Sequence, residues 1–184
     1  MKKTNRIVVG FLLVTPLIAS FVQGQTQTAE EKIQNAMSAG PASIAKDATI
    51  IDWPTKEGEK PPVLRKGTNA WTCLPNYPAT PGNDPMCLDK MWMNWLDGYM
   101  NKTAPKITAP GFAYMLQGGS DASNDDPFAE KPKPGEDWMT APPHFMVILP
   151  DKLDTSVFSK DDHSGGPWIM FGGTPYEHLM VPVK

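Results

Sequence analysis

The sequence predicts an α+β fold with a mostly antiparallel sheet of about five to seven short strands, one main amphipathic helix and long loops rich in proline and glycine. The 20 prolines and 15 glycines favour long, rigid connections between short elements. One segment in the first half has helical spacing, whereas strand-like composition dominates the second half. The predicted strands of that half are short, apolar and rich in β-forming residues: 111–116, 144–149, 167–172 and 178–183.

The N-terminal third supplies further elements. Thr28 and Glu31 have the spacing of a capping box, which predicts a short helix from there to Met37. Beyond this helix we predict a strand over 48–54 and a hairpin over 63–74, with the turn of the hairpin at Lys66–Gly67.

The main helix is predicted to begin at Asp84. Asp is a favourable N-cap residue, and Pro85 suits the first helical position, where a missing N–H costs nothing. Apolar side chains then recur three and four residues apart, so we expect one face of this helix to pack on the sheet. The residues on that face are Leu88, Met91, Trp92, Trp95, Leu96 and Tyr99.

The order of the last strands follows from general rules of connection. Successive antiparallel strands most often form a simple up-and-down meander, which we expect for the last three. The middle two of the four predicted strands are apolar on both faces, which indicates central strands covered on each side. Pro182 has no backbone N–H, which indicates an edge strand.

Residues 1–24 have the layout of a secretory signal peptide. Basic residues precede an apolar run over 7–19, which is shorter than the ~20 residues needed to span a bilayer. Val22 and Gly24 place small side chains where cleavage after Gly24 requires them. We therefore expect a periplasmic or secreted protein whose mature part, 25–184, is a single domain without a membrane span.

The charge of the chain limits its partners. Loss of the predicted signal peptide lowers the formal net charge from −3 to −6, because it removes three basic residues and no acidic ones. No tract rich in Lys or Arg remains, which argues against nucleic acid as a partner. The expected partner is an unknown small-molecule or protein ligand, and the sequence does not identify a cofactor.

Cys73 and Cys87 are the 2 cysteines of the chain. In an oxidising compartment an isolated pair is most simply one disulfide bond. A redox role would need a Cys-x-x-Cys motif or a second partner, and neither is present. We therefore predict a structural Cys73–Cys87 disulfide.

The meander predicts that polar residues gather at one rim of the sheet. His144 and His178 would each begin a strand that runs in the same direction, and the exit of strand 111–116 would reach the same edge. Two imidazoles beside carboxylates are able to bind zinc or copper, or to orient a water for hydrolysis. The simpler interpretation is that they hydrogen-bond the nearby loops. The candidate ligand-binding residues at this rim are Gln117, Ser120, Asp121, His144, Tyr176 and His178.

Catalysis and metal binding at the rim remain alternatives. In an enzyme, Ser120 would be the nucleophile, His144 or His178 its base, and Glu177 or Asp121 the group that orients the base. The residues around Ser120 depart from G-x-S-x-G, so a role in a turn is the simpler interpretation. A metal ion would be held by His144, His178 and Asp121.

A calcium loop is a further hypothesis for the stretch after Gly119. Asp121, Ser123 and Asp125 alternate as the first three ligands of such a loop do. The pattern then fails, because Asp126 stands where Gly belongs and Pro132 where a bidentate Glu belongs. The stretch is better explained as a turn.

The chain also contains four distinctive stretches: LRKGTNAWTCLP, DPMCLDKMWMNW, MLQGGSDASNDDPFA and GGPWIMFGGTPYEHLMVPV. Together they resemble a family of uncharacterised exported bacterial proteins. The resemblance implies a bacterial envelope or extracellular setting and a single domain. It implies no activity, cofactor or site residue.

These observations predict an exported binding or interaction module whose ligand meets the rim. The absence of a recognised catalytic motif and the long polar loops beside a compact apolar sheet favour this class. The alternatives are a hydrolase or metal-binding protein that uses His144 and His178, and a purely structural envelope protein whose rim is closed by its own loops.

Overall fold

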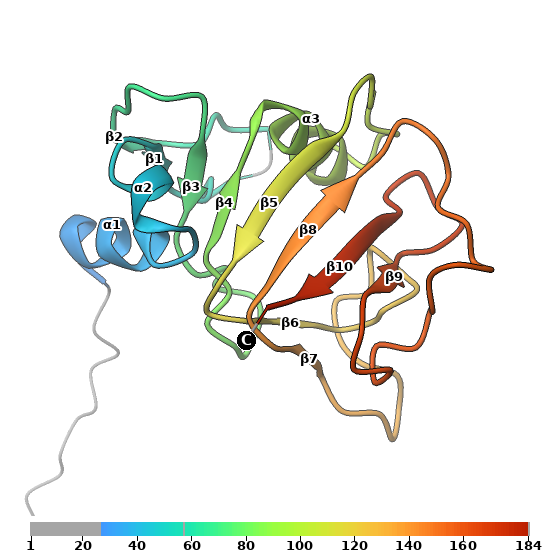
Figure 1. Cartoon of the computed structure of the whole chain (residues 1–184). Coiled ribbons are helices and arrows are strands. Elements are labelled where there is room, and N and C mark those ends of the chain that lie inside the picture. Colours follow the sequence, from blue (N-terminus) through green and yellow to red (C-terminus); the bar gives the residue numbers. More distant parts are fainter. Residues whose placement is uncertain (1–26, 57, 184) are drawn as a thin grey trace, which may run out of the picture.

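A computed structural model describes residues 27–56 and 58–183, and shows the predicted α+β class (Figure 1). The predicted signal peptide lies outside the described residues. None of the described helices combines the length and apolar character needed to cross a bilayer. The helices are α1 (Ala29–Met37), α2 (Ala42–Ala45) and α3 (Lys90–Met100). The strands are β1 (Thr49–Ile51), β2 (Val63–Arg65), β3 (Thr72–Leu74), β4 (Met86–Leu88), β5 (Gly111–Met115), β6 (Gly119–Asp121), β7 (Met139–Ala141), β8 (His144–Ile148), β9 (Trp168–Met170) and β10 (His178–Pro182).

The main sheet is larger than predicted. It has 8 strands in the order β2-β1-β3-β4-β5-β8-β10-β9, and β6 and β7 form a separate two-stranded sheet. The pairing of β1 with β3 is parallel, which departs from the arrangement that the sequence predicts. The other pairings within the main sheet are antiparallel.

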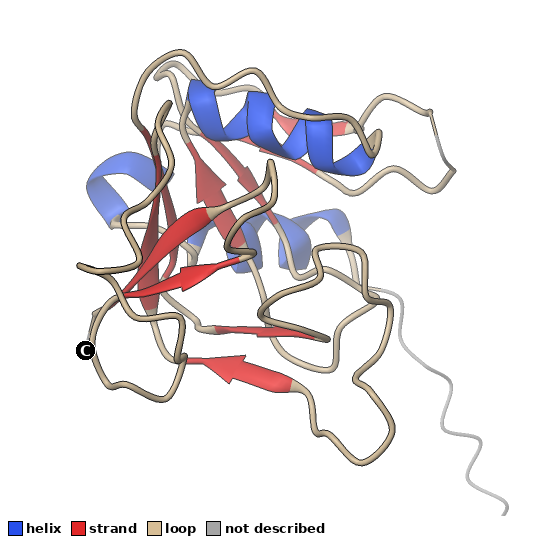
Figure 2. Cartoon of the chain, turned by 90° about the vertical axis from the view of Figure 1, so that its right-hand side faces the viewer, coloured by secondary structure: helices blue, strands red, loops and turns tan. Residues whose placement is uncertain are grey.

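The alternation of side chains along each strand divides the core between the two faces of the sheet. Ile50 and Cys73 pack with α1 and α2 in one apolar cluster. Their neighbours Ile51 and Leu74 point the other way, into a larger cluster that contains Trp92 and Trp95 of α3. In Figure 2, α3 lies at the top of the molecule and β6 and β7 lie at the bottom. The larger cluster is the one that reaches the candidate site.

The N-terminal predictions hold for the first helix and fail for the hairpin. Thr28 and Glu31 form the predicted capping box at the start of α1. The predicted hairpin over 63–74 is wrong, because β2 and β3 do not pair with each other. Both pair with β1, which lies between them. The segment 66–71 is therefore not a tight turn, because it connects β2 to β3 across the intervening strand β1.

The main helix begins later than predicted. Met86–Leu88 form β4, and α3 starts at Lys90 with Asp89 as its N-cap. The Asp89 carboxylate accepts hydrogen bonds from the N–H groups of Met91 and Trp92 at 2.9 Å. Residues 86–88 are extended because they pair with β3 on one side and β5 on the other. Local helical spacing alone does not show these two partners.

The strand order in the second half differs from a meander. β10 lies between β8 and β9, so β9 is an edge strand, whereas we had predicted a central one. Pro182 lies on an inner strand, but β9 pairs only with residues 178–180 of β10, so the sheet continues on one side of Pro182. Leu179 pairs with Val147 and Pro182 with His144. The two predicted rim histidines therefore begin antiparallel neighbours, at opposite ends.

The predicted Cys73–Cys87 disulfide is confirmed. The two residues are a cross-strand pair of β3 and β4, and both are fully buried in the cluster beneath α1. The bond therefore links two neighbouring strands of the main sheet.

Replacement of both cysteines by alanine is expected to lower the free energy of unfolding by about 2–3 kcal/mol. Closure of a loop of this length stabilises by about 3 kcal/mol in the chain-entropy model, and the prolines within the loop reduce that gain. Urea unfolding of the wild type and the double variant measures the difference. Dithiothreitol should lower the free energy of unfolding of the wild type and leave that of the double variant unchanged. A loss below about 0.5 kcal/mol in the double variant would contradict the prediction.

Candidate functional site

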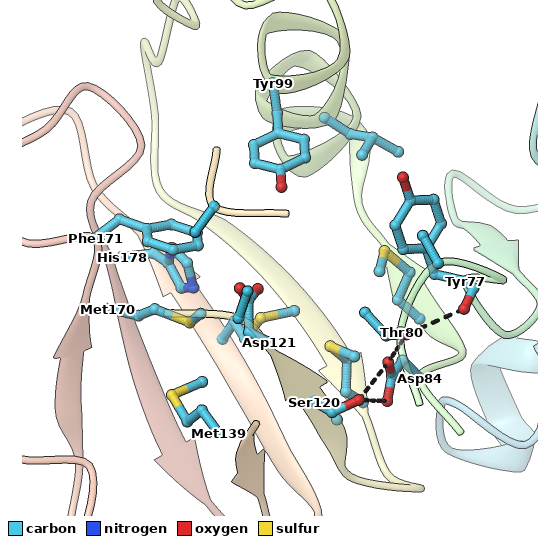
Figure 3. A pocket seen from close by; sticks show the side chains of 18 of the residues that line it. Tyr77, Thr80, Asp84, Tyr99, Ser120, Asp121, Met139, Met170, Phe171 and His178 are labelled. Atoms are coloured by element: carbon cyan, nitrogen blue, oxygen red, sulfur yellow. Dashed lines mark hydrogen bonds between the residues drawn. The ribbon is translucent and has the colours of Figure 1, made fainter. Parts of the chain in front are cut away.

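A cavity of about 520 Å³ lies on the α3 face of the main sheet (Figure 3). The loop over residues 75–85 and the C-terminal half of α3 form one wall, and β6, β7 and the loop between them form the other. Strands β4, β5, β8, β9 and β10 supply the floor. The floor residues are Met86, Leu88, Met115, His144, Met146, Met170 and His178. Pockets of this size hold small organic molecules in other proteins.

Aromatic side chains make up much of the wall. The ring of Tyr99 stacks on Trp95 with centroids 5.2 Å apart, and on Phe128 with centroids 5.6 Å apart. Because its ring packs on these two neighbours, Tyr99 presents its hydroxyl group to the cavity, as Figure 3 shows. Trp92 and Phe171 complete this side with buried rings. An apolar ligand would bury its surface against them.

Ser120 and Asp84 close the opposite end of the cavity. The Ser120 hydroxyl donates to the Asp84 carboxylate at 3.0 Å and accepts from the Gly82 N–H at 3.0 Å. A Cβ at Gly82 would lie 2.5 Å from both side chains, so this close approach requires glycine. The hydroxyl of Thr80 also donates to Asp84. Asp84 is 3% exposed and ties β6 to the loop before β4.

Asp121 projects from β6 into the cavity (Figure 3). Its carboxylate accepts the backbone N–H of Ser123 at 3.3 Å. Burial raises the pKa of Asp121 to about 6, backbone N–H groups oppose this effect, and the nearby Asp84 adds to it. Burial and the charge of Asp121 also raise the pKa of Tyr99. A carboxylate is thus held in an apolar space at a cost in free energy.

The two histidines of the floor are buried in one fixed tautomer. His144 Nδ1 donates to the Pro142 carbonyl at 2.6 Å, and His178 Nδ1 donates to the Tyr176 carbonyl at 2.9 Å. A carbonyl only accepts, so Nδ1 carries the proton and Nε2 of the neutral ring carries a lone pair. Nε2 of His144 is buried and has no hydrogen-bond partner.

Burial keeps both rings neutral. It lowers the pKa of His178 to about 4, against the opposing effect of the Tyr176 carbonyl, and the nearby His144 adds a smaller lowering effect. Burial also lowers the pKa of His144, against the opposing effect of the Pro142 carbonyl. At neutral pH the floor therefore offers imidazole acceptors and no imidazolium charge.

The structure divides the predicted rim residues into two groups. Ser120, Asp121, His144 and His178 line the cavity. The other three have contacts elsewhere. Gln117 is exposed and donates to the Ser38 carbonyl at 3.2 Å. The Tyr176 hydroxyl donates to the Thr103 carbonyl at 3.0 Å. The Glu177 carboxylate accepts the N–H groups of Leu153 at 2.8 Å and Gly173 at 2.6 Å.

The contacts of Ser120 and His144 do not form a catalytic pair. The Ser120 hydroxyl donates to Asp84, and Nε2 of His144 has no partner. In the described part of the chain, three potential ligand groups converge at Asp161, Asp162 and His163, on an exposed loop away from the rim.

The calcium hypothesis also lacks converging ligands. The side chain of Asp121 turns into the cavity, whereas Asp125 is exposed. The Ser123 hydroxyl accepts the N–H groups of Asp125 and Asp126, as in a side-chain-capped turn. Asn124 then fastens this turn to the sheet, because its backbone carbonyl accepts the Phe171 N–H at 2.7 Å. The turn holds Asp121 in place.

Sequence reasoning missed Asp84 and the hydroxyl of Tyr99. Asp84 was predicted to be a helix N-cap, a role that acidic residues before proline often have. Tyr99 was predicted to lie on the buried helix face. Its hydroxyl group, which needs a polar partner or solvent, indicated that this face is not wholly covered by apolar core. No local pattern links Asp84 to Ser120, which is 36 residues away.

Comparison of the chain with protein-family models, with curated proteins and with solved structures finds no match.

Replacement of His178 by glutamine is expected to change the pH dependence of stability. The folded protein binds a proton at His178 near pH 4, whereas an unfolded histidine does so near pH 6.5, so the unfolded state binds more protons between these values. The wild type should lose about 3 kcal/mol relative to His178→Gln as the pH falls from 7 to 4. Urea unfolding at several pH values measures this difference.

A comparison with the variant is needed because Asp121 acts in the opposite direction. Its pKa is about 6 in the folded protein against 3.8 when unfolded, so its protonation stabilises the fold as the pH falls through 6. The matched control is His163→Gln on the exposed loop, which should change stability at pH 7 by less than about 0.5 kcal/mol. A constant difference between His178→Gln and the wild type from pH 7 to 4 would refute the buried, neutral His178.

Proposed function

We propose that the protein is an exported binding protein that encloses a small, mainly apolar ligand in the cavity. The observation that carries this proposal is a cavity of about 520 Å³ with aromatic and methionine walls and a few inward polar groups. Such a combination characterises small-molecule sites, where apolar surface supplies affinity and polar groups set orientation. The floor methionines are flexible and polarisable, which suits a wall that adapts to its ligand.

Exposed lining residues at the end of α3 and on the loop after β6 mark the mouth of the cavity, through which it is accessible from solvent. Met100 and Phe128 are 37% and 39% exposed, although both line the cavity. Lys102 at the end of α3 and Glu130 on the β6–β7 loop are exposed lining residues of opposite charge. A ligand can therefore enter between α3 and this loop and bury its apolar part beyond them.

A periplasmic or secreted location belongs to the same proposal. The Cys73–Cys87 disulfide forms and persists in oxidising compartments and is rare in the cytosol. The predicted signal peptide over residues 1–24 and the resemblance to exported bacterial proteins support the same location.

The geometry favours binding over the hydrolase and metal alternatives. Hydrolysis by Ser120 needs a base that contacts its hydroxyl, and that hydroxyl is held by Asp84 and Gly82. A shared metal ion needs converging nitrogens, whereas His144 and His178 begin neighbouring strands at opposite ends. A binding role requires only that Ser120, His144 and His178 line the cavity, which they do in the observed arrangement.

An uncharged fluorescent probe, N-phenyl-1-naphthylamine, is expected to bind the mature protein with a blue-shifted, enhanced emission. Met139 on β7 lines the cavity, so Met139→Trp fills space there and should weaken probe binding by about tenfold or more. Fluorescence titration measures both affinities.

The matched control is Val157→Trp, which adds the same ring at a side chain that is 68% exposed on a loop outside the cavity. Its affinity for the probe should equal that of the wild type. Absence of probe binding to the wild type, or equal loss in both variants, would overturn the proposed cavity site. Urea unfolding of Met139→Trp checks that the fold is retained, because overpacking can destabilise a core.

A further inference from the structure

The floor histidines contribute hydrogen-bond acceptors to the cavity, and the Nε1–H of Trp92 is a buried lining donor without a partner. Since Nδ1 of each imidazole donates to a backbone carbonyl, His144 and His178 have only Nε2 lone pairs left to offer. His144 is 1% exposed and its Nε2 has no partner. Figure 3 shows a ring nitrogen of His178 directed toward the Asp121 side of the cavity. A ligand that satisfies these atoms must donate hydrogen bonds.

The charges that line the cavity are predominantly negative. Asp84, Asp121 and Glu130 face a single basic lining residue, Lys102, among the residues that the structure describes. Lys102 lies at the mouth, with its Nζ 5.7 Å from the centroid of the Phe128 ring. In the described ranges, ion pairs join Lys32 to Asp52 and Lys46 to Asp47, and none of these residues lines the cavity.

Asp121 differs from Asp84 in what remains open to a ligand. The Asp84 carboxylate accepts the hydroxyls of Thr80 and Ser120. The Asp121 carboxylate accepts a backbone N–H, and it faces the Tyr99 hydroxyl across the cavity in Figure 3. A buried carboxylate without a cationic partner is costly, and a bound cation would remove that cost.

From this arrangement we infer that the cavity selects ligands with a protonated primary or secondary amine on an apolar, aromatic-sized body. The ammonium group would donate to Asp121 and to the imidazole nitrogen beside it, while the body packs on the aromatic wall. This inference rests on the proposed binding function and adds the chemical class of the ligand. A quaternary ammonium has no N–H to donate, so it satisfies the charge of Asp121 and leaves the acceptors without a partner.

The same arrangement makes binding dependent on pH. A carboxylic acid with a pKa of about 6 is largely neutral at pH 5, so an amine must then compete with a proton at Asp121. The titratable and charged groups around Asp121 are Tyr77 and Asp84 on the loop before β4, Tyr99 and Lys102 at the end of α3, His144 on β8, Tyr176 and His178 at the start of β10, and Asp126 and Glu130 on the loop after β6.

Isothermal titration calorimetry of the mature protein with matched probes tests the inference. The probes are 2-phenylethylamine, the neutral 2-phenylethanol, the anionic 3-phenylpropanoate and the quaternary phenylethyltrimethylammonium. At pH 7.5 we expect 2-phenylethylamine to bind about tenfold or more tightly than the alcohol, and the quaternary ion to lie between them. The preference for the amine should shrink at pH 5.

Asp121→Asn is the variant that removes the proposed charge. It should lose the preference for the amine over 2-phenylethanol and the pH dependence of that preference. The matched control is Asp125→Asn, which removes a carboxylate from the same turn at an exposed position outside the cavity. Its amine preference should equal that of the wild type.

The possible outcomes separate this inference from the proposed function. Equal affinity for amine and alcohol, or a preference for the carboxylate probe, would overturn amine selection while N-phenyl-1-naphthylamine still reports a binding cavity. Retention of the amine preference in Asp121→Asn would also overturn it. Failure of every probe, including the naphthyl probe, would overturn both statements.

Discussion

The pairing of β5 with β8 is the contact on which the molecule depends. It joins the five strands that end with β5 to the three strands β8, β10 and β9, through a continuous register from Gly111 opposite Ile148 to Met115 opposite His144. Because side chains alternate along a strand, this register places Met115, His144 and Met146 on the face covered by α3. A shift by one residue would turn these side chains to the opposite face and remove the floor of the cavity.

The cavity is an unfilled continuation of the larger core. Trp92, Trp95 and Met146 belong both to the packed cluster and to the cavity lining. Protein interiors are normally packed without voids of this size, and they rarely keep a carboxylate facing such a space. The contacts among Gly82, Asp84 and Ser120 fix β6 to the loop before β4. On the other side of Asp121, Asn124 is hydrogen-bonded to Ile169 of β9 and to Phe171, which follows β9. Rigid supports on both sides of Asp121 are what a pre-formed site requires.

Part of the candidate site was predictable, although the route to it was wrong. Ser120, Asp121, His144 and His178 were expected together because a meander would place two histidines at one edge. They share a cavity instead because the side chains at the start of β8 and of β10 point to the same face of the sheet, the face covered by α3. Strand alternation is local, so the face of each residue could be inferred. A meander would also place Gln117 and Glu177 at this edge. In the observed order, with β10 between β8 and β9, both side chains bind backbone groups elsewhere.

Local chemistry is visible in the amino-acid order itself. The capping box of α1, the apolar strands β5, β8, β9 and β10, and the Cys73–Cys87 bond all follow from residue types a few positions apart or from an isolated pair of thiols. Contacts between distant segments determined everything else. β4 is a strand because β3 and β5 flank it, although its residues also fit a helical pattern, and Asp84 became part of the cavity because Ser120 lies beside it. The free energies of such pairings depend on surfaces that meet only after the chain has closed its loops, so no short window of sequence contains them.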